Sequence, residues 1–166
     1  MSKKYLILLS LSGLIICLDQ LTKALVQTQF ALGESISVIS GFFNLTYVRN
    51  FGAAFGIFAD LPPIAREMFF LSMPPIAILI ILAILRGVHE KDWWQILALS
   101  SVFAGAIGNY IDRLRFRYVI DFLDFHYKEI YSWPAFNVAD MAIVGGVMLL
   151  LLLMSLESRQ KVKNEK

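Results

Sequence analysis

The sequence is poor in the residues that bind metals or form covalent cross-links. One of its 166 residues is cysteine and two are histidine. The single cysteine, Cys17, excludes an intramolecular disulfide and a cysteine-based metal site. His89 and His126 fall in different expected loops, far from the spacing of a His-x-x-x-His site. We therefore expect neither a metal ion nor a cofactor.

Charge is also scarce, at 17% of the residues and a net charge of +2. No basic stripe alternates with aromatic residues, so we expect no nucleic-acid partner. Apolar residues are abundant instead, at 58% of the chain with a mean hydropathy of +0.66. A soluble domain is usually about 45–50% apolar. The composition predicts an integral membrane protein with a single domain spanning 1–166, in contact with membrane lipid.

Four apolar segments are long enough to cross a bilayer as helices, which takes roughly 20 residues. They cover about residues 5–26, 64–85, 93–111 and 138–156. Lys3 and Lys4 precede the first segment, as in a secretory signal peptide. The apolar run is too long for one, however, and no Ala-x-Ala site follows it. The first segment is therefore expected to be an uncleaved membrane helix.

Two long segments separate these helices, at about residues 27–63 and 112–137. Partial alternation of apolar and polar residues within 36–50 predicts short strands. We expect residues 113–137 to form a loop, and the tail at about 158–166 to be disordered. The fold class is thus an all-α membrane protein: four transmembrane helices with a small extracytoplasmic β-containing part.

Four spans place both termini on one side of the membrane. Eight basic residues share that side, against six or seven on the other, which is a weak positive-inside signal for cytoplasmic termini. Of the thirteen acidic residues, four fall on the cytoplasmic side and nine at or beyond the opposite face. Any carboxylate chemistry is therefore expected at the outer face. The eight basic residues are Lys3, Lys4, Arg86, Lys91, Arg159, Lys161, Lys163 and Lys166.

In the first helix, Asp19 and Lys23 are spaced i, i+4 and share a face in the favourable acid-before-base order. One interpretation is a structural ion pair near the outer end, with the lysine reaching toward the surface. The alternatives are that the pair positions a loop or substrate, or that Asp19 takes part in catalysis.

The third helix ends in polar residues at Asn109, Asp112 and Arg113. Asn109 and Asp112 share a helix face, and Arg113 could pair with a carboxylate bidentately. Beside an arginine, Asp112 would stay ionised and be a poor general acid. These residues favour a helix end tied down by its own side chains.

Asn137 and Asp140 open the fourth helix. Asn137 suits the N-cap and Asp140 the N3 position, where an acid completes a capping box and favours the helix dipole. The competing interpretation is a catalytic role, since an ionisable group near the bilayer marks a functional site by default.

Asp121 lies among large apolar residues in Val-Ile-Asp-Phe-Leu-Asp-Phe at 119–125. Desolvation there would raise its carboxyl pKa, and a second nearby carboxylate would raise one of the pair further. Two carboxylates sharing a proton can activate a water and protonate a carbonyl, which is peptide hydrolysis without a nucleophilic side chain. No convincing Ser–His or Cys–His arrangement competes with this.

Five motifs in order resemble those of the lipoprotein signal peptidases (signal peptidase II), membrane aspartic proteases of bacteria. They are Asp-Gln-Leu-Thr-Lys at 19–23, Asn-Phe-Gly-Ala-Ala-Phe at 50–55, Gly-Asn-Tyr-Ile-Asp-Arg at 108–113, Val-Ile-Asp-Phe at 119–122 and Phe-Asn-Val-Ala-Asp at 136–140. The resemblance covers most of the chain, with no departure at a motif position.

This resemblance implies that Asp121 and Asp140 form the catalytic dyad. It also implies substrate-binding or supporting roles for a wider set, whereas Asp124 matches no motif position. The supporting residues are Asp19, Lys23, Asn50, Gly52, Ala53, Ala54, Phe55, Gly105, Asn109, Asp112, Arg113, Asn137 and Ala139.

The implied reaction is cleavage of a diacylglyceryl-modified prolipoprotein on the amino side of its lipidated cysteine, at the outer face of the bacterial cytoplasmic membrane. Residues 27–63 would form an extracytoplasmic cradle, and we expect a monomer. Two other hypotheses stay open. One is a small transporter or channel subunit with a carboxylate relay. The other is a membrane scaffold whose acids serve only as caps and ion pairs.

Overall fold

Four helices among the described residues are long and apolar enough to cross a membrane. The computed structural model describes residues 2–52, 62–128 and 130–164. The helices match the four expected spans, but each is longer because it continues beyond its apolar run. They are α1 (Lys3–Gln29), α2 (Pro63–Gly87), α3 (Trp93–Phe116) and α4 (Val138–Asn164).

The C-terminal end of α4 corrects one expectation. The helix continues to Asn164, where the sequence pattern predicted a disordered tail from about residue 158. Residues 157–164 contain neither glycine nor proline, and most of them are good helix formers. A polar segment of this kind continues a helix past the end of its apolar part.

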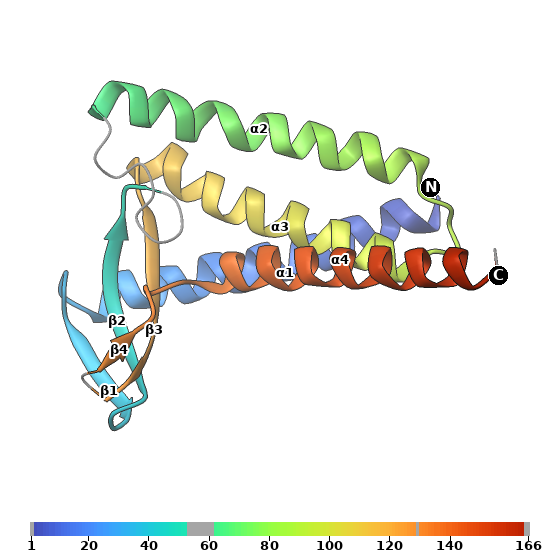
Figure 1. The fold of residues 1–166 in the computed structure, drawn as a ribbon. Coiled ribbons are helices and arrows are strands. Elements are labelled where there is room, and N and C mark those ends of the chain that lie inside the picture. The colour runs from blue at the N-terminus through green and yellow to red at the C-terminus, as the bar shows by residue number, and fades with distance from the viewer. Residues whose placement is uncertain (1, 53–61, 129, 165–166) are drawn as a thin grey trace.

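The helices run side by side, with both termini at one end of the molecule and a sheet at the other (Figure 1). Helix α3 contacts all three other helices, most extensively α4 and α1. Two glycines of α3 allow the close approach to α4: a Cβ at Gly105 would overlap the backbone oxygen of Ala139, and one at Gly108 would come within 3.1 Å of the Ala139 Cβ. Small residues permit such close approach of helices in membranes.

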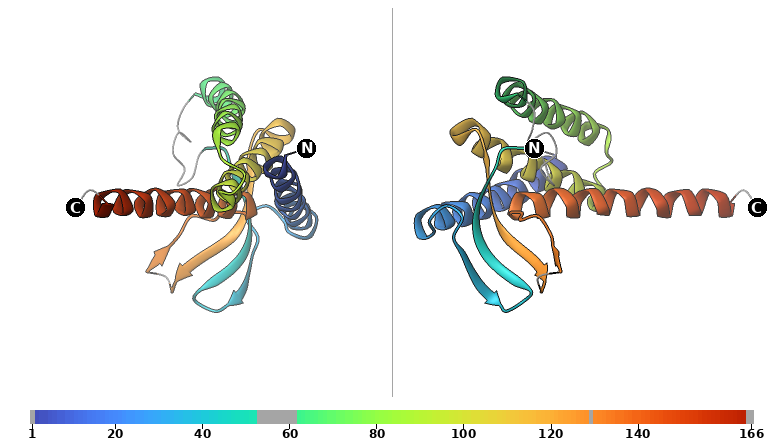
Figure 2. Two further views of the ribbon diagram at one scale, coloured as in Figure 1. Left: turned by 90° about the vertical axis from the view of Figure 1, so that its right-hand side faces the viewer. Right: turned by 60° about the vertical axis from the view of Figure 1, so that its left-hand side comes forward.

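The sheet has four antiparallel strands in the order β1-β2-β3-β4. The strands are β1 (Ser35–Ile39), β2 (Phe43–Asn50), β3 (Val119–Tyr127) and β4 (Tyr131–Ser132). They extend to one side of the helices, as both views in Figure 2 show. The strands expected within 36–50 are thus confirmed.

Strand β3 corrects a second expectation, because Asp121 and His126 were expected in loops. All four residues at the start of the strand, 119–122, are buried, so this part carries no alternation of apolar and polar residues. A strand covered on both faces cannot be recognised by its periodicity.

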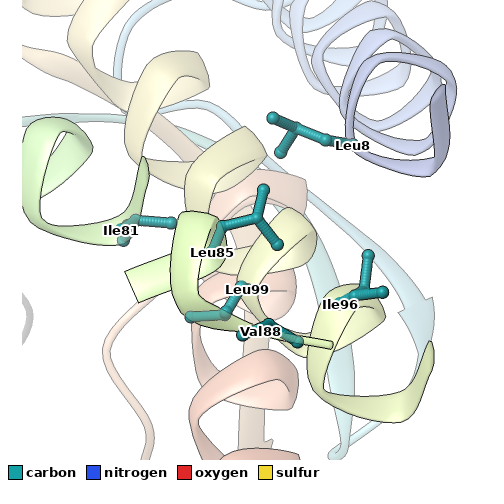
Figure 3. Close-up of a cluster of buried hydrophobic side chains, with 6 residues drawn as sticks. All are labelled: Leu8, Ile81, Leu85, Val88, Ile96 and Leu99. Carbon is teal, nitrogen blue, oxygen red and sulfur yellow. The ribbon is translucent and has the colours of Figure 1, made fainter. Parts of the chain in front are cut away.

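Two apolar clusters pack at opposite ends of the molecule. One joins α1, α2 and α3 near the termini and consists of Leu8, Ile81, Leu85, Val88, Ile96 and Leu99 (Figure 3). The other joins α1 to the sheet through Val26, Tyr47, Ile120 and Phe122. On α1, Asp19 and Lys23 lie between Leu8 and Val26, so the buried polar residues occupy the zone between the clusters.

Candidate active site

Asp121 is held in β3 by two asparagine amides. It is 2% exposed, and its neighbour across the sheet is Val48 of β2. The Asn137 Nδ2 donates to Asp121 Oδ1 at 2.6 Å, and the Asn50 Nδ2 donates to Asp121 Oδ2 at 2.9 Å. Each carboxylate oxygen therefore has a neutral donor, and the side chain is fixed in orientation.

Asp140 stands in the first turn of α4 and takes part in the expected capping box. The backbone N–H of Asp140 donates to Asn137 Oδ1 at 2.9 Å, and the backbone N–H of Asn137 donates to Asp140 Oδ2 at 3.2 Å. The other oxygen, Oδ1, accepts a hydrogen bond from Asn109 Nδ2 at 2.7 Å. Asp140 remains half-buried, so the capping geometry leaves it accessible.

Asn137 joins the two carboxylates. It is fully buried, its side-chain amide donates to Asp121, and its backbone N–H donates to Asp140. Its Nδ2 also lies 3.2 Å from Asn109 Oδ1 and from the Ile120 carbonyl oxygen. One residue thus ties β3, α3 and the start of α4 together at the point where the two acids converge.

A buried ionic cluster lies beside this pair. Lys23 is 1% exposed, and its Nζ lies 2.9 Å from Asp19 Oδ2 and 3.0 Å from Asp112 Oδ2. Asp19 Oδ1 accepts the Ala139 backbone N–H at 2.9 Å, and Asp112 Oδ2 accepts the Ile120 N–H at 3.1 Å. The cluster therefore connects α1 and α3 to the residues directly preceding Asp121 and Asp140.

Arg113 makes different contacts from those expected. It donates from a terminal guanidinium nitrogen to the Gly52 carbonyl oxygen at 3.1 Å and lies over the Phe70 ring at 4.8 Å. Among the described residues it forms no ion pair, and Asp112 pairs with Lys23 instead. Arg113 consequently holds the chain after Asn50 against α2 and α3.

The pKa of Asp121 is raised to about 7, mainly by burial and next by the charge of Asp140. The hydrogen bonds from Asn50 and Asn137 act in the opposite direction. A carboxyl group with this pKa is poised to hold and release a proton near neutral pH, as a general acid requires.

Most of the predicted site residues come together in this zone. Gly105 and Ala139 form the α3–α4 contact, and Gly52 donates its N–H to Asn50 Oδ1 at 2.9 Å. Asp124 lies apart from them, beside Asn44 and His126. Ala53, Ala54 and Phe55 lie outside the described residues.

Two contributors were missed. Gln20 donates from Nε2 to Asp19, to Asp112 and to the Gly108 carbonyl oxygen, at 3.0–3.2 Å. Its place between Asp19 and Lys23 in the first motif was a usable signal. The Ile120 backbone groups are the second contributor, and no side-chain pattern reveals them.

This geometry combines two carboxylates, neither of which forms an ion pair with the described residues, and neutral amides that hold them in place. It is suited to activating a water with one carboxylate and protonating a carbonyl oxygen with the other.

Known proteins share this chain's sequence and fold over most of its length. A family profile described as Signal peptidase (SPase) II matches residues 11–156. The lipoprotein signal peptidase of Syntrophus aciditrophicus is 46% identical over 97% of this chain and 99% of its own length. That of Desulforapulum autotrophicum is 51% identical over 83% of this chain and 85% of its own length.

Solved structures agree with the sequence relatives. A structure described as a bacterial membrane enzyme, determined by the in meso method at 2.3 Å resolution, superposes with a TM-score of 0.83 at 30% identity. The match covers 93% of this chain and 90% of that chain. The chain therefore belongs to the signal peptidase II family, membrane aspartic proteases that remove signal peptides from prolipoproteins.

Proposed function

We propose that Asp121 and Asp140 are the catalytic dyad, and that they cleave a diacylglyceryl-modified prolipoprotein on the amino side of its lipidated cysteine. The observation that carries this proposal is the double attachment of Asn137, whose side-chain amide holds Asp121 while its backbone N–H holds Asp140. Acids from separate elements are thereby brought to one point.

The two acids take different roles in the proposed reaction. Asp121, with its pKa of about 7, holds the proton, and the half-buried Asp140 is the base. Asp140 takes a proton from a water as that water attacks the scissile carbonyl carbon, and Asp121 protonates the carbonyl oxygen. When the tetrahedral intermediate collapses, the C–N bond breaks and the proton on Asp140 passes to the leaving amine of the lipidated cysteine. Asp121 takes back a proton from a hydroxyl group of the intermediate as the carbonyl forms again.

The location of the site suits a substrate anchored in lipid. Asp140 occupies the first turn of an apolar helix, and Asp121 lies in the sheet beside it, at the end of the molecule opposite the termini (Figure 1). We place this end at the outer face of the cytoplasmic membrane, with both termini in the cytoplasm. We further propose that the protein acts as a monomer.

The transporter hypothesis loses its support. It requires acids spread through the depth of the membrane as a relay. The buried acids of the described helices, Asp19 and Asp112, are instead bound to Lys23 in one cluster beside the proposed dyad.

The decisive experiment is cleavage of a synthetic diacylglyceryl-cysteine prolipoprotein peptide by the purified protein. Asp121→Asn and Asp140→Asn should each lower the cleavage rate by at least about 10³-fold, because each removes a group that transfers a proton. Both variants should still insert into membranes and remain monodisperse in detergent.

Asp124→Asn is the matched control, because it removes a carboxylate from the same strand away from the site. It should keep nearly the wild-type rate. Normal cleavage by either dyad variant would contradict the assignment, and loss of cleavage in Asp124→Asn alone would mean that the partner was wrongly chosen.

A further inference from the structure

The asparagine amides around the two carboxylates are oriented by hydrogen-bond donors that contact their Oδ1 atoms. Asn50 Oδ1 accepts the Gly52 N–H, and Asn137 Oδ1 accepts the Asp140 N–H, both at 2.9 Å. The oxygen of each amide is therefore occupied by a backbone donor. Its NH₂ group must face the other way, toward Asp121.

Asn109 has the same role toward Asp140, but no backbone N–H orients it. Its Oδ1 lies 3.0 Å from Lys23 Nζ, and its Nδ2 lies 2.7 Å from Asp140 Oδ1. An ammonium group has three donors and no acceptor, so the atom facing Lys23 must be the oxygen. The amide NH₂ is consequently directed at the carboxylate.

Lys23 is itself held without freedom to turn. Its three N–H groups have three acceptors, namely Asp19 at 2.9 Å, Asp112 at 3.0 Å and Asn109 at 3.0 Å. At 1% exposure the side chain has no route to a substrate. Any effect on the reaction must therefore be indirect, and the shortest route from the ammonium to a proposed dyad carboxylate runs through the side chain of Asn109.

We infer that Lys23 is a positioning residue: its ammonium, held by Asp19 and Asp112, keeps the Asn109 amide turned so that it donates to Asp140. The inference rests on the proposed function, in which Asp140 is the ionised base. Without the ammonium, the Asn109 oxygen keeps only the 3.2 Å contact from Asn137 Nδ2, whose two hydrogens also serve Asp121 and the Ile120 carbonyl oxygen. The Asn109 amide is then held less firmly with its NH₂ group toward Asp140.

The donor effect and the charge effect of Lys23 are separable. The Lys23 charge lowers the pKa of Asp121, whereas the Asp140 charge raises it. Removal of the lysine charge alone should therefore raise the pKa of Asp121 and shift the high-pH limb of the rate profile to higher pH. The charged groups around Asp121 are Asp140 on α4, Lys23 and Asp19 on α1, and Asp112 and Arg113 on α3.

Two variants separate these effects. Lys23→Met removes the donor and the charge, and leaves Asp19 and Asp112 without their cation. The double variant Lys23→Met with Asp112→Asn also removes the donor, but it keeps the formal charge of the cluster: two carboxylates and one ammonium give −1, and one carboxylate alone gives −1.

Both variants should lose about 10- to 100-fold in kcat, the effect of one hydrogen bond to a charged group, with KM unchanged because Lys23 is buried. The high-pH limb of the rate profile should shift to higher pH in Lys23→Met and return to its wild-type pH in the double variant. Wild-type kcat in the folded double variant would overturn the inference, because Lys23 would then serve only to balance charge.

Lys4→Met is the control on the same helix. Lys4 Nζ donates to the Arg86 and Val88 carbonyl oxygens at 2.7 and 3.0 Å, at the far end of α1. Its loss should lower thermal stability in detergent without changing kcat or the pH profile of the folded protein. A similar kcat loss in Lys4→Met would contradict the inference, because loss of any hydrogen-bonded lysine of α1 would then lower the rate.

An NMR measurement on the wild type tests the orientation directly and needs no variant to fold. In protein labelled with ¹⁵N-asparagine, the Asn109 NH₂ protons should show NOEs to Asp140 and none to the Lys23 Hε protons. NOEs to Lys23 would overturn the inference. Failure of the wild type to cleave the lipidated peptide, with the expected NOEs present, would instead contradict the proposed function.

Discussion

Asp121 is subject to opposing influences from its surroundings. Burial and the Asp140 charge raise its pKa, while the Asn50 and Asn137 amides lower it. The balance leaves the carboxyl with a pKa of about 7, compared with 3.8 for an unperturbed aspartate. Neutral amides thus orient this side chain without pairing it with a cation, which would have kept it ionised.

The pH dependence of cleavage follows from this pKa. The proposed mechanism requires Asp121 in its protonated form, which predominates below its folded-state value of about 7. The cleavage rate at saturating substrate should therefore decline by about tenfold for each pH unit above that value. A rate profile from pH 5 to 9 measures this, and a rate that keeps rising above pH 8 would contradict the acid role.

The same shift has a consequence for stability. The folded-state pKa of Asp121 is raised, so protonated Asp121 stabilises the folded protein. This contribution to the free energy of unfolding is fully present below pH 3.8 and is lost as the pH rises through about 7. Asp140→Asn removes the repelling charge, so ¹³C NMR titration of that variant should give Asp121 a lower pKa than in the wild type. An unchanged value would show that the two carboxylates do not interact.

At the scale of elements, the site depends on how closely α3 approaches the start of α4. A Cβ at Gly105 would overlap the Ala139 oxygen and lie 2.7 Å from Ile143 Cγ1, whereas Gly145 has nothing within 4 Å. Separation of the helices would also pull Asn109 on α3 away from Asp140 on α4, a hydrogen bond of 2.7 Å.

Gly105→Ala should therefore destabilise the protein by about 1–3 kcal/mol, the usual effect of overpacking, and lower the cleavage rate of the folded fraction. Gly145→Ala makes the same substitution on α4 in open space, so it should leave the cleavage rate unchanged and should not lower the stability. Thermal unfolding in detergent and the peptide assay measure the two effects. Equal stability and equal cleavage rates in the two variants would mean that α3 and α4 can shift to accommodate the added methyl group.

The elements differ in how far their sequence could predict them. The four helices were predictable because their apolar runs are long. Strand β3 was not, because its buried start shows no alternation, and Asp121 was consequently expected in a loop. Its pairing with β2, which brings Asn50 to Asp121, joins residues 71 positions apart, and no local pattern encodes that.

The candidate site shows the same division. Asp140 and Asn137 were recognisable as a capping box, and the structure confirms both of its hydrogen bonds. The Asp19–Lys23 pair was predictable from its spacing. That Asp112 joins this pair, and that Arg113 binds a carbonyl oxygen instead, depends on how α1 packs against α3. Tertiary packing selected among partners that the sequence left open.

For the whole molecule, the arrangement of termini and sheet makes the membrane orientation testable. The termini and the connection between α2 and α3 lie at one end, and the sheet lies at the other (Figure 1). The excess of basic residues at the first end is small, so the positive-inside rule gives only a weak preference. The proposed reaction requires the sheet outside, where a translocated prolipoprotein is anchored.

Single cysteines in a Cys17→Ser background decide the orientation. Ser132→Cys on β4 and Glu90→Cys between α2 and α3 both occupy exposed positions at opposite ends. A membrane-impermeant maleimide added to intact spheroplasts should label the cysteine at 132 and leave the one at 90 unlabelled until the cells are lysed. The reverse pattern would place the dyad in the cytoplasm, where it could not meet a translocated substrate.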